Sequence, residues 1–389
     1  MSEWTFGAVG DVFVNRPDPA NAFRHCAVVL RQIDLVFGNC EGAFTNRPHY
    51  APSAGWRVVA GEANGAGLRA AGFHVMACAN NHILDAGHQG LVDTLALLRN
   101  QGIKTVGAGR DAAAAHEPAF EERAGLRIGF LSYASVYQAG YEARKGVPGL
   151  APMRVHSHYY IPEWDAYGKV EPGAPPQVRT IPFPEDVEKL RVQIADTRKH
   201  ADLVVVSFHQ GQASRPAILT DYEVTLARAA VDFGADVVLG HHHHFLRGIE
   251  IHKGKPIFYG LGHFVFDLPG LETALNPLEL VKLHAMGEFA IYPRAGYPLS
   301  PFHPDARMTM IAVCCYEGRD LKSAGFVPCL INGDNHAVPV DADGEHGRAV
   351  LRYMEEISEA AGLHTTYRRG GRRIGAYQLV DATAASARS

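Results

Sequence analysis

Histidines directly follow two short apolar segments of this sequence, and neutral imidazole is the most common metal ligand among side chains. Residues 204–208 lead into His209, and residues 236–240 lead into four consecutive histidines, 241–244. Each segment is typical of a buried parallel strand, because it is short, apolar and rich in valine. The residues between them, 217–234, have the apolar spacing of a helix. The sequence therefore predicts a strand–helix–strand unit that brings imidazoles to the carboxyl edge of a sheet, where ligands bind in open α/β folds.

Polar side chains follow three earlier apolar segments in the same manner. Asp11, Glu41 and the pair Asn81-His82 each come just after a short segment that is predicted to be a strand. One aspartate in such a place would most often cap a turn, and Asn-Asn-His could be an ordinary turn sequence. Repetition at successive strand ends instead favours a common site at one edge of the sheet.

Two carboxylates, one amide and three imidazoles form the predicted ligand set: Asp11, Glu41, Asn81, His209, His242 and His244. This set suits two divalent ions of borderline softness, such as Mn, Zn or Fe. A carboxylate can bridge two metals about 3.5–4 Å apart, and such a pair can activate a shared water. On an extended chain His242 and His244 would face the same side, so we expect His241 and His243 to point away.

The composition is that of a soluble globular enzyme. The chain has 389 residues, 47% apolar and 20% charged, with a net charge of -4, which gives no attraction to nucleic acid. Six cysteines without CxxC spacing predict free thiols in a reducing compartment. No leader pattern and no stretch of roughly 18 apolar residues is present, so we expect a cytoplasmic protein without a membrane anchor.

The remaining pattern places further elements around these strands. Residues 135–183 are rich in Tyr, Pro and Gly and form a predicted insertion, either a lid or a surface excursion. His156-Ser157-His158 within it lacks a predicted strand to hold it. Helices are expected at 19–33, 61–72, 88–101, 184–199 and 345–361, an antiparallel strand pair at 308–316 and 326–331, and a last strand at 374–380.

Over residues 5–268 the chain resembles the CapA (poly-γ-glutamate capsule synthesis) family, a branch of the calcineurin-like metallophosphoesterase superfamily. The segments that carry the resemblance are Gly10-Asp11 with Arg16, Asn39-Cys40-Glu41-Gly42, Asn80-Asn81-His82 with Asp85, His209 with Gly211, 240–244 and 262–267. The resemblance implies a four-layer α/β sandwich, in which two mixed sheets are flanked by helices. It implies a core over residues 1–268 and a C-terminal extension, 269–389, with a hairpin and a helix that complete the same fold.

The resemblance also implies roles for the predicted ligands. Asp11 and His244 match ligands of the first metal, and Glu41 matches the bridging carboxylate. The second-metal ligands match Asn81, His209 and His242, and the general acid matches His82. With Asp85 and His263, His82 completes the predicted catalytic groups.

Five positions depart from the family pattern. Phe13 stands where the superfamily has a histidine, and Gln210 and Ala213 replace a tryptophan and a glutamate. His243 stands in place of a proline. His263 replaces an asparagine, and could be an extra ligand or an acid–base group facing the substrate. These departures weaken the expectation of a capsule role.

The residues and the resemblance together predict a binuclear metal-dependent hydrolase. A metal-bridging hydroxide would attack a phosphoester or an amide or peptide-like bond of a small anionic substrate, which Arg16 and Arg57 would hold. The sequence does not choose between these bonds. It leaves open an accessory factor in polymer synthesis or export, a di-iron oxygen-using enzyme, and the oligomeric state, including a homo-oligomer.

Overall fold

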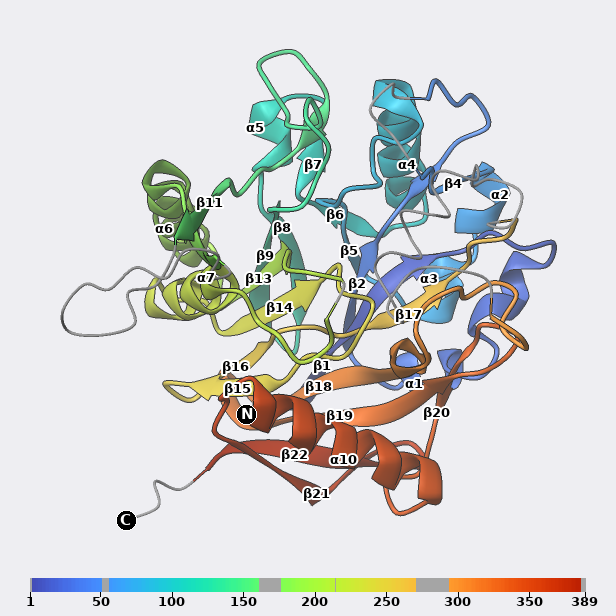
Figure 1. The fold of residues 1–389 in the computed structure, drawn as a ribbon, viewed down its shortest axis with the longest axis vertical. Coiled ribbons are helices and arrows are strands. Elements are labelled where there is room, and N and C mark those ends of the chain that lie inside the picture. The colour runs from blue at the N-terminus through green and yellow to red at the C-terminus, as the bar shows by residue number, and fades with distance from the viewer. Residues whose placement is uncertain (1, 51–55, 161–175, 214, 271–293, 386–389) are drawn as a thin grey trace.

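The computed structural model describes residues 2–50, 56–160, 176–213, 215–270 and 294–385, which fold around two β-sheets (Figure 1). The larger sheet has ten strands, in spatial order β21 (Thr365–Ile374), β22 (Tyr377–Ala384), β19 (Asp320–Ile331), β18 (Met308–Glu317), β1 (Glu3–Phe13), β2 (Leu35–Cys40), β5 (Val75–Ala77) and β6 (Lys104–Val106), with β17 (His263–Phe266) beside β1 and β20 (Ala337–Pro339) beside β19. The smaller sheet has six: β15 (Ile249–His252), β16 (Lys255–Phe258), β14 (Val237–His241), β13 (Leu203–His209), β9 (Leu126–Ala134) and β8 (Ala119–Arg123).

The strands that precede the predicted ligands run parallel to their neighbours. In the larger sheet β1 pairs in parallel with β2 and β17, and β2 pairs in parallel with β5. In the smaller sheet β13 pairs in parallel with both β9 and β14. The register places Asp11 opposite Asn39 and His263, and His209 opposite His241. The carboxyl ends of these strands therefore meet at one edge of each sheet.

Both faces of each sheet are buried, which explains the uninterrupted valine runs in the sequence. In β13, Val205 belongs to the core between the sheets, whereas Val204 and Val206 belong to the core beneath the outer helices. The two sheets touch through aromatic rings, and Phe37 stacks on Phe130 with 5.8 Å between ring centroids.

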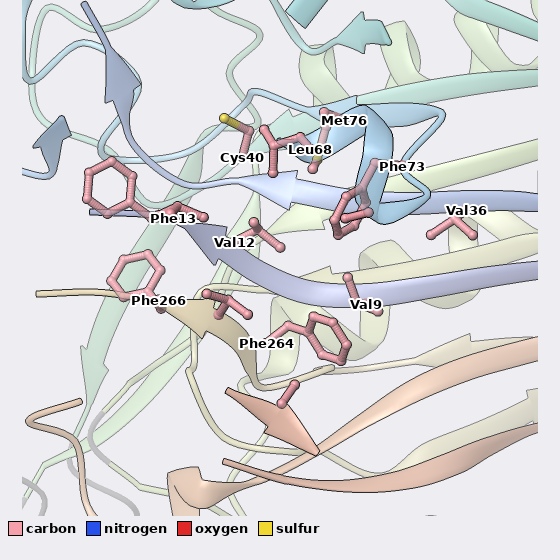
Figure 2. Packing of buried hydrophobic residues seen from close by; sticks show 14 of the residues in the cluster. Val9, Val12, Phe13, Val36, Cys40, Leu68, Phe73, Met76, Phe264 and Phe266 are labelled. Carbon is pink, nitrogen blue, oxygen red and sulfur yellow. The ribbon is translucent and has the colours of Figure 1, made fainter. Parts of the chain in front are cut away.

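Helices cover the outer face of each sheet and complete four layers (Figure 1). The larger sheet is covered by α1 (Ala27–Leu30), α2 (Glu62–Gly65), α3 (Leu68–Ala71) and α4 (Gly87–Asn100), and the smaller by α6 (Pro184–Arg198) and α7 (Asp221–Asp232). Figure 2 shows the core under the first group, where Leu68 and Phe73 lie near Val36 and Met76. The predicted four-layer sandwich is therefore the observed fold.

The C-terminal segments extend the same larger sheet, because β18 pairs antiparallel with β1 and β19 with β18. The helix α10 (Glu345–Ala360) contacts β19 and β21 through Val350, Met354 and Ile357. The shorter elements are β3 (Ala43–Phe44), β4 (Val59–Ala60), β7 (Ala108–Gly109), β10 (Gly149–Leu150), α5 (Ala112–Ala115) and the 3-10 turns Pro19–Phe23 and Pro304–Arg307. None of the helices in the described part of the chain is both long and apolar enough to cross a membrane.

Two predicted helices are each divided into two short pieces. Residues 19–33 form a 3-10 turn and α1, and residues 61–72 form α2 and α3, which are separated at Ala66 and Gly67. Glycine weakens a helix interior by about 1 kcal/mol relative to alanine, so tertiary packing decides whether it continues. The last predicted strand, 374–380, was also incomplete, because β21 and β22 form a longer hairpin there.

The expectation that the His156-Ser157-His158 segment lacks a strand was wrong. These residues lie in β11 (Val155–Tyr160), which pairs antiparallel with β12 (Gln177–Pro182). Both histidines are exposed, and the His156 ring stacks on Phe183 at 3.8 Å between centroids. Residues 161–175 of the predicted insertion lie outside the described residues, so its role as a lid stays a prediction.

Candidate metal centre

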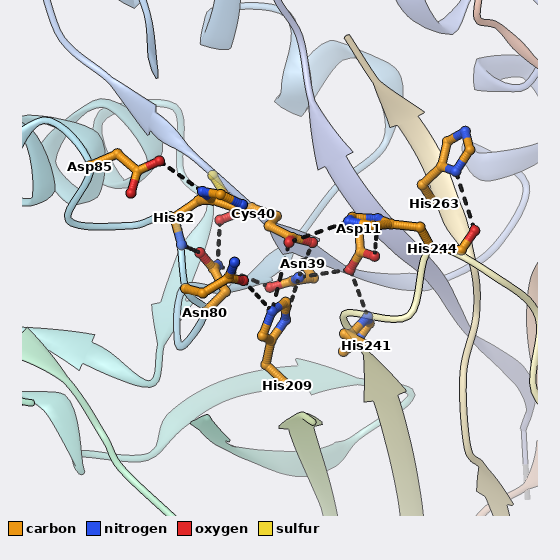
Figure 3. Close-up of polar contacts among 12 residues, drawn as sticks. Asp11, Asn39, Cys40, Asn80, His82, Asp85, His209, His241, His244 and His263 are labelled. Atoms are coloured by element: carbon orange, nitrogen blue, oxygen red, sulfur yellow. Dashed lines mark hydrogen bonds and ion pairs between the residues drawn. The ribbon is translucent and has the colours of Figure 1, made fainter. Parts of the chain in front are cut away.

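The predicted ligands come together where the strands of the two sheets end (Figure 3). Asp11 lies near the end of β1, Glu41 directly follows β2, and His209 is the last residue of β13. β1 approaches the chain before β17 so closely that a Cβ on Gly10 would lie 1.8 Å from the carbonyl oxygen of Gly262. Glycine at position 10 therefore lets the segment that carries Asp11 enter the site.

Two overlapping groups of ligand atoms share one carboxylate. Glu41, His209 and His242 offer atoms that all lie within 4.8 Å of one another, and so do Asp11, Glu41 and His244. Asn81 joins the first group, because its Oδ1 lies 2.7 Å from Nε2 of His209. The six predicted ligands thus form two adjacent sets with Glu41 in both, as a bridging carboxylate requires.

The hydrogen bonds within the cluster leave donors and acceptors unmatched. Asp11 Oδ2, Glu41 Oε1, His242 Nδ1 and His244 Nδ1 are buried and have no hydrogen-bond partner. Nδ1 of His244 lies 3.1 Å from Oδ2 of Asp11 as an ion-pair contact. Buried polar atoms without partners are rare, and each one costs about 1–3 kcal/mol. A divalent cation would satisfy these oxygen and nitrogen atoms together, so the residues present fit a metal pair.

The electrostatics of the cluster agree with such a fit. Burial lowers the pKa values of His209 and His242 well below that of free imidazole, which keeps their lone pairs available as ligands. Burial and the neighbouring Asp11 raise the pKa of Glu41. Burial also raises the pKa of Asp11, but His244, His241 and His209 outweigh it and hold that pKa below its usual value. Among the described residues, the ion-pair contacts of these two carboxylates are with histidines and not with a lysine or arginine.

The histidine run does not have the expected extended backbone. β14 ends at His241, and His242 and His244 adopt positive φ angles of 98° and 60°. The run is therefore a turn. The expectation that His242 and His244 reach one side by alternation along an extended chain was wrong, although both residues reach the cluster. His243 does point away, towards Glu223. His241 does not, because its Nδ1 lies 3.6 Å from Oδ1 of Asp11.

Two asparagines that were not predicted as site residues support the carboxylates. Asn39 donates from Nδ2 to Oδ1 of Asp11 at 2.8 Å and to Oε2 of Glu41 at 3.4 Å. Asn80 donates from Nδ2 to Oδ1 of Asn39 at 3.2 Å and to the carbonyl of Cys40 at 2.7 Å. The spacing of Asn39 and Glu41, two residues apart at a strand end, was the signal that could have identified the first of them.

A histidine–aspartate pair flanks the ligand groups. Nδ1 of His82 lies 2.7 Å from Oδ2 of Asp85, and the His82 side chain is 12% exposed whereas Asp85 is buried. The Val58 N–H donates to Oδ2 of Asp85 at 2.7 Å, and the Tyr141 hydroxyl donates to Oδ1 at 3.0 Å. Asp85 is thus held on three sides, and it fixes the His82 ring at the rim of the cluster. Sequence reasoning missed Tyr141, which lies 56 residues away from Asp85.

The two predicted anion-binding arginines have different surroundings. The side chain of Arg16 is 6% exposed, and its guanidinium forms a two-point salt bridge with buried Asp267. The donors of Arg16 already have partners within the protein, and the expectation that it holds an anionic substrate group stays a prediction. Arg57 is exposed, with its guanidinium carbon 4.4 Å from the Tyr50 ring centroid, and it directly precedes Val58.

His263 lies on the far side of the cluster from His82 (Figure 3). Its Nδ1 is 3.3 Å from the carbonyl oxygen of His244, its Nε2 is 3.4 Å from Oγ of Ser300, and the residue is fully buried. Burial lowers the pKa of His263 to about 3. Neither ligand group includes His263. The structure therefore gives it polar contacts within the protein, and its catalytic role stays a prediction.

This chain is similar to several known proteins. It is 30% identical to the PGA biosynthesis protein CapA of Bacillus subtilis over 299 residues, which cover 73% of this chain and 70% of that protein. It is 35% identical to a probable polyglutamine synthesis accessory protein of Mycobacterium tuberculosis over 218 residues, which cover 54% of this chain and 50% of that protein. Among solved structures, calcineurin-like phosphoesterase YfkN from Bacillus subtilis aligns with a TM-score of 0.37 and 12% identity, covering 92% of this chain and 98% of that one.

The family model described as bacterial capsule synthesis protein PGA_cap matches residues 5–268. That range contains both ligand groups and the His82–Asp85 pair, and it does not include β18 and the later strands that extend the larger sheet. The chain therefore belongs to the PGA_cap family of bacterial capsule synthesis proteins.

Proposed function

We propose that this chain is a binuclear metal-dependent hydrolase that cleaves a phosphoester or an amide-type bond in a small anionic substrate. The observation that carries the proposal is the bridging position of Glu41 between two sets of buried, unmatched ligand atoms. A site built only for stability would pair these atoms within the protein. When bound, a pair of divalent ions would activate a water and stabilise negative charge that develops on the substrate.

The side chains around the ligand groups supply the remaining chemistry. His82 is the residue proposed to protonate the leaving group, and Asp85 holds its ring through Nδ1 so that Nε2 is left for the substrate. Proton transfer by a positioned side chain contributes about 10²–10⁴-fold to a rate. Arg57 is the proposed anion-binding residue, because it is exposed and adjacent to Val58, whose N–H contacts Asp85. The six buried free cysteines support a reducing compartment such as the cytoplasm.

The proposal is tested by metal analysis and hydrolysis on the same untagged preparation. We expect about two transition-metal ions per chain from the bridged geometry, and hydrolysis of p-nitrophenyl phosphate, bis-p-nitrophenyl phosphate or a γ-glutamyl anilide. The substrate that turns over would identify the bond class, and the bound metal would separate Mn or Zn from Fe. Protein that neither binds metal nor turns over any of the three after Mn or Zn is added back would overturn the hydrolase proposal.

A second candidate is an accessory factor in poly-γ-glutamate synthesis or export, which binds metal without hydrolysis. The names of the two relatives favour it, since one is a biosynthesis protein and the other a probable synthesis accessory protein. Affinity purification from cells would distinguish the candidates. Recovery of a polymer synthase complex with metal-loaded but inactive protein would favour the accessory role, and a freely purified active protein would favour the hydrolase.

A further inference from the structure

One member of the histidine run faces away from the metal centre and towards a buried carboxylate. His243 lies between the ligands His242 and His244, and its Nε2 is 2.7 Å from Oε1 of Glu223. His243 is 1% exposed and Glu223 is fully buried. A carboxylate only accepts hydrogen bonds here, so the imidazole donates through its Nε2–H. Neither residue belongs to a ligand group.

The two oxygens of Glu223 have different partners. Oε1 accepts from His243, whereas Oε2 accepts from the backbone N–H of Thr220 at 2.7 Å and from the Thr220 hydroxyl at 2.6 Å. Thr220 is the N-cap of α7, and Glu223 is its third helical residue, so these contacts form a capping box. One carboxylate therefore connects the start of α7 to the centre of the histidine run.

Close packing leaves the His243 ring little room to move. Gly211 has a φ of +89°, and a Cβ there would lie 2.2 Å from Nε2 of His243 and 2.4 Å from Oε1 of Glu223. On the other side, a Cβ on Gly260 would lie 3.0 Å from Nδ1 of His243. The backbone N–H of Gly211 is itself held by the hydroxyl of Tyr222 at 2.6 Å. The ring is therefore confined between two glycines and one carboxylate.

The residues on either side of His243 need such an anchor. His242 and His244 both have positive φ angles, which are uncommon for residues with a side chain and which surrounding contacts help to maintain. We propose that Glu223 and His243 are positioning residues that hold His242 and His244 in the geometry for metal binding. This inference rests on the proposed metal centre. It adds α7, an element that contributes no ligand, to the parts of the fold that determine metal affinity.

A pair of substitutions at position 243 tests the proposal, with one control on the helix. His243→Leu removes the donor to Glu223, whereas His243→Gln retains an N–H close to the position of Nε2. Thr220→Val removes a hydroxyl from the capping box but leaves the Glu223–His243 bond intact. For each protein, Zn²⁺ affinity is measured by competition with a chromophoric chelator, and thermal stability is measured in parallel on the metal-free form.

We expect His243→Leu to weaken Zn²⁺ binding by about 10–100-fold, the loss typical of groups that orient metal ligands. His243→Gln should stay within about threefold of the wild type, and Thr220→Val should lose thermal stability without losing affinity. Equal affinity of His243→Leu and the wild type would overturn the positioning role alone, and so would equal losses in all three variants. Absence of Zn²⁺ binding by the wild type would overturn the proposed metal centre, and this inference with it.

Discussion

The buried carboxylates that lie near the ends of β1, β2 and β17 differ in the groups that neutralise them. Asp267 follows β17, and both of its oxygens have donors within the protein. Arg16 donates to both oxygens, the Asn15 N–H donates to Oδ2 at 3.0 Å, and Asn335 donates to Oδ1 at 2.7 Å. Like Asp11 and Glu41, Asp267 is 0% exposed.

Asp11 and Glu41 lie in the opposite situation. Each keeps one oxygen without a hydrogen bond, and the groups that face them are imidazoles, of which His209 and His241 have lowered pKa values. A buried carboxylate is thus structural when a guanidinium neutralises it, and a candidate cation ligand when only imidazole and amide groups surround it. Burial alone does not distinguish a metal site from a salt bridge, whereas unmatched oxygen and nitrogen atoms gathered around one point favour a metal site.

The largest effect that tests this comparison is expected from Glu41→Gln. Because Glu41 belongs to both ligand groups, its loss should reduce metal affinity by more than about 100-fold, beyond the loss from groups that only orient ligands. Hydrolysis should fall with it. Metal analysis and steady-state kinetics on the purified variant check both. A variant that retains two metals and full activity would show that Glu41 is not the bridge.

Asp267→Asn is expected to act on stability, with little dependence on metal. Removing one partner of a buried pair leaves Arg16 uncompensated, which costs about 3–5 kcal/mol in the free energy of unfolding. Urea unfolding with added metal and with a chelator should show the same loss. A loss of stability that appears only with metal present would place Asp267 within the metal centre. Asp267 would then no longer differ in role from Asp11 and Glu41.

In the metal-free protein, Glu41→Gln is expected to be stabilising. The pKa of Glu41 is raised in the folded state by burial and by Asp11, so the folded protein binds a proton more readily than the unfolded chain. The stability of the metal-free wild type must then fall as pH rises above the ordinary glutamate range, and the variant should avoid this loss, by about 1–3 kcal/mol at neutral pH. Unfolding experiments with a chelator between pH 4 and 8 measure the difference in the free energy of unfolding between the variant and the wild type. This difference should become smaller as the pH falls towards 4.

The smallest effect concerns His74, which lies outside both regions. The Val36 N–H donates to Nδ1 of His74 at 3.1 Å, and burial lowers the pKa of His74 to about 4. The unfolded chain therefore binds the proton more readily, and this residue lowers stability as pH falls from about 6.5 towards 4. His74→Asn, which keeps an acceptor near Nδ1, should reduce that acid loss by about 1 kcal/mol after allowance for partial exposure. Acid titration of unfolding with and without metal should give the same difference, unlike that for Glu41→Gln.

The sequence by itself determined the position of the cluster. Valine-rich runs buried on both faces specify parallel strands, and the residue after such a run lies at the carboxyl edge whatever the rest of the chain does. Asp11, Glu41, His209 and the histidine run could therefore be assigned to one edge from local pattern alone. The resemblance to the CapA family then indicated which of the two metals each residue would bind, because the family has the same residue types at the same strand ends.

The tertiary structure decided which polar groups are matched and which are not. Arg16 pairs with Asp267, which lies 251 residues away along the chain, and Tyr141 donates to Asp85, which lies 56 residues away. Contacts between residues so far apart depend on how the layers pack, and no local period encodes them. The turn at His242 and the bond between His243 and Glu223 have the same origin. Strand ends are local properties of a sequence, whereas the pairing of a buried charge is a property of the assembled fold.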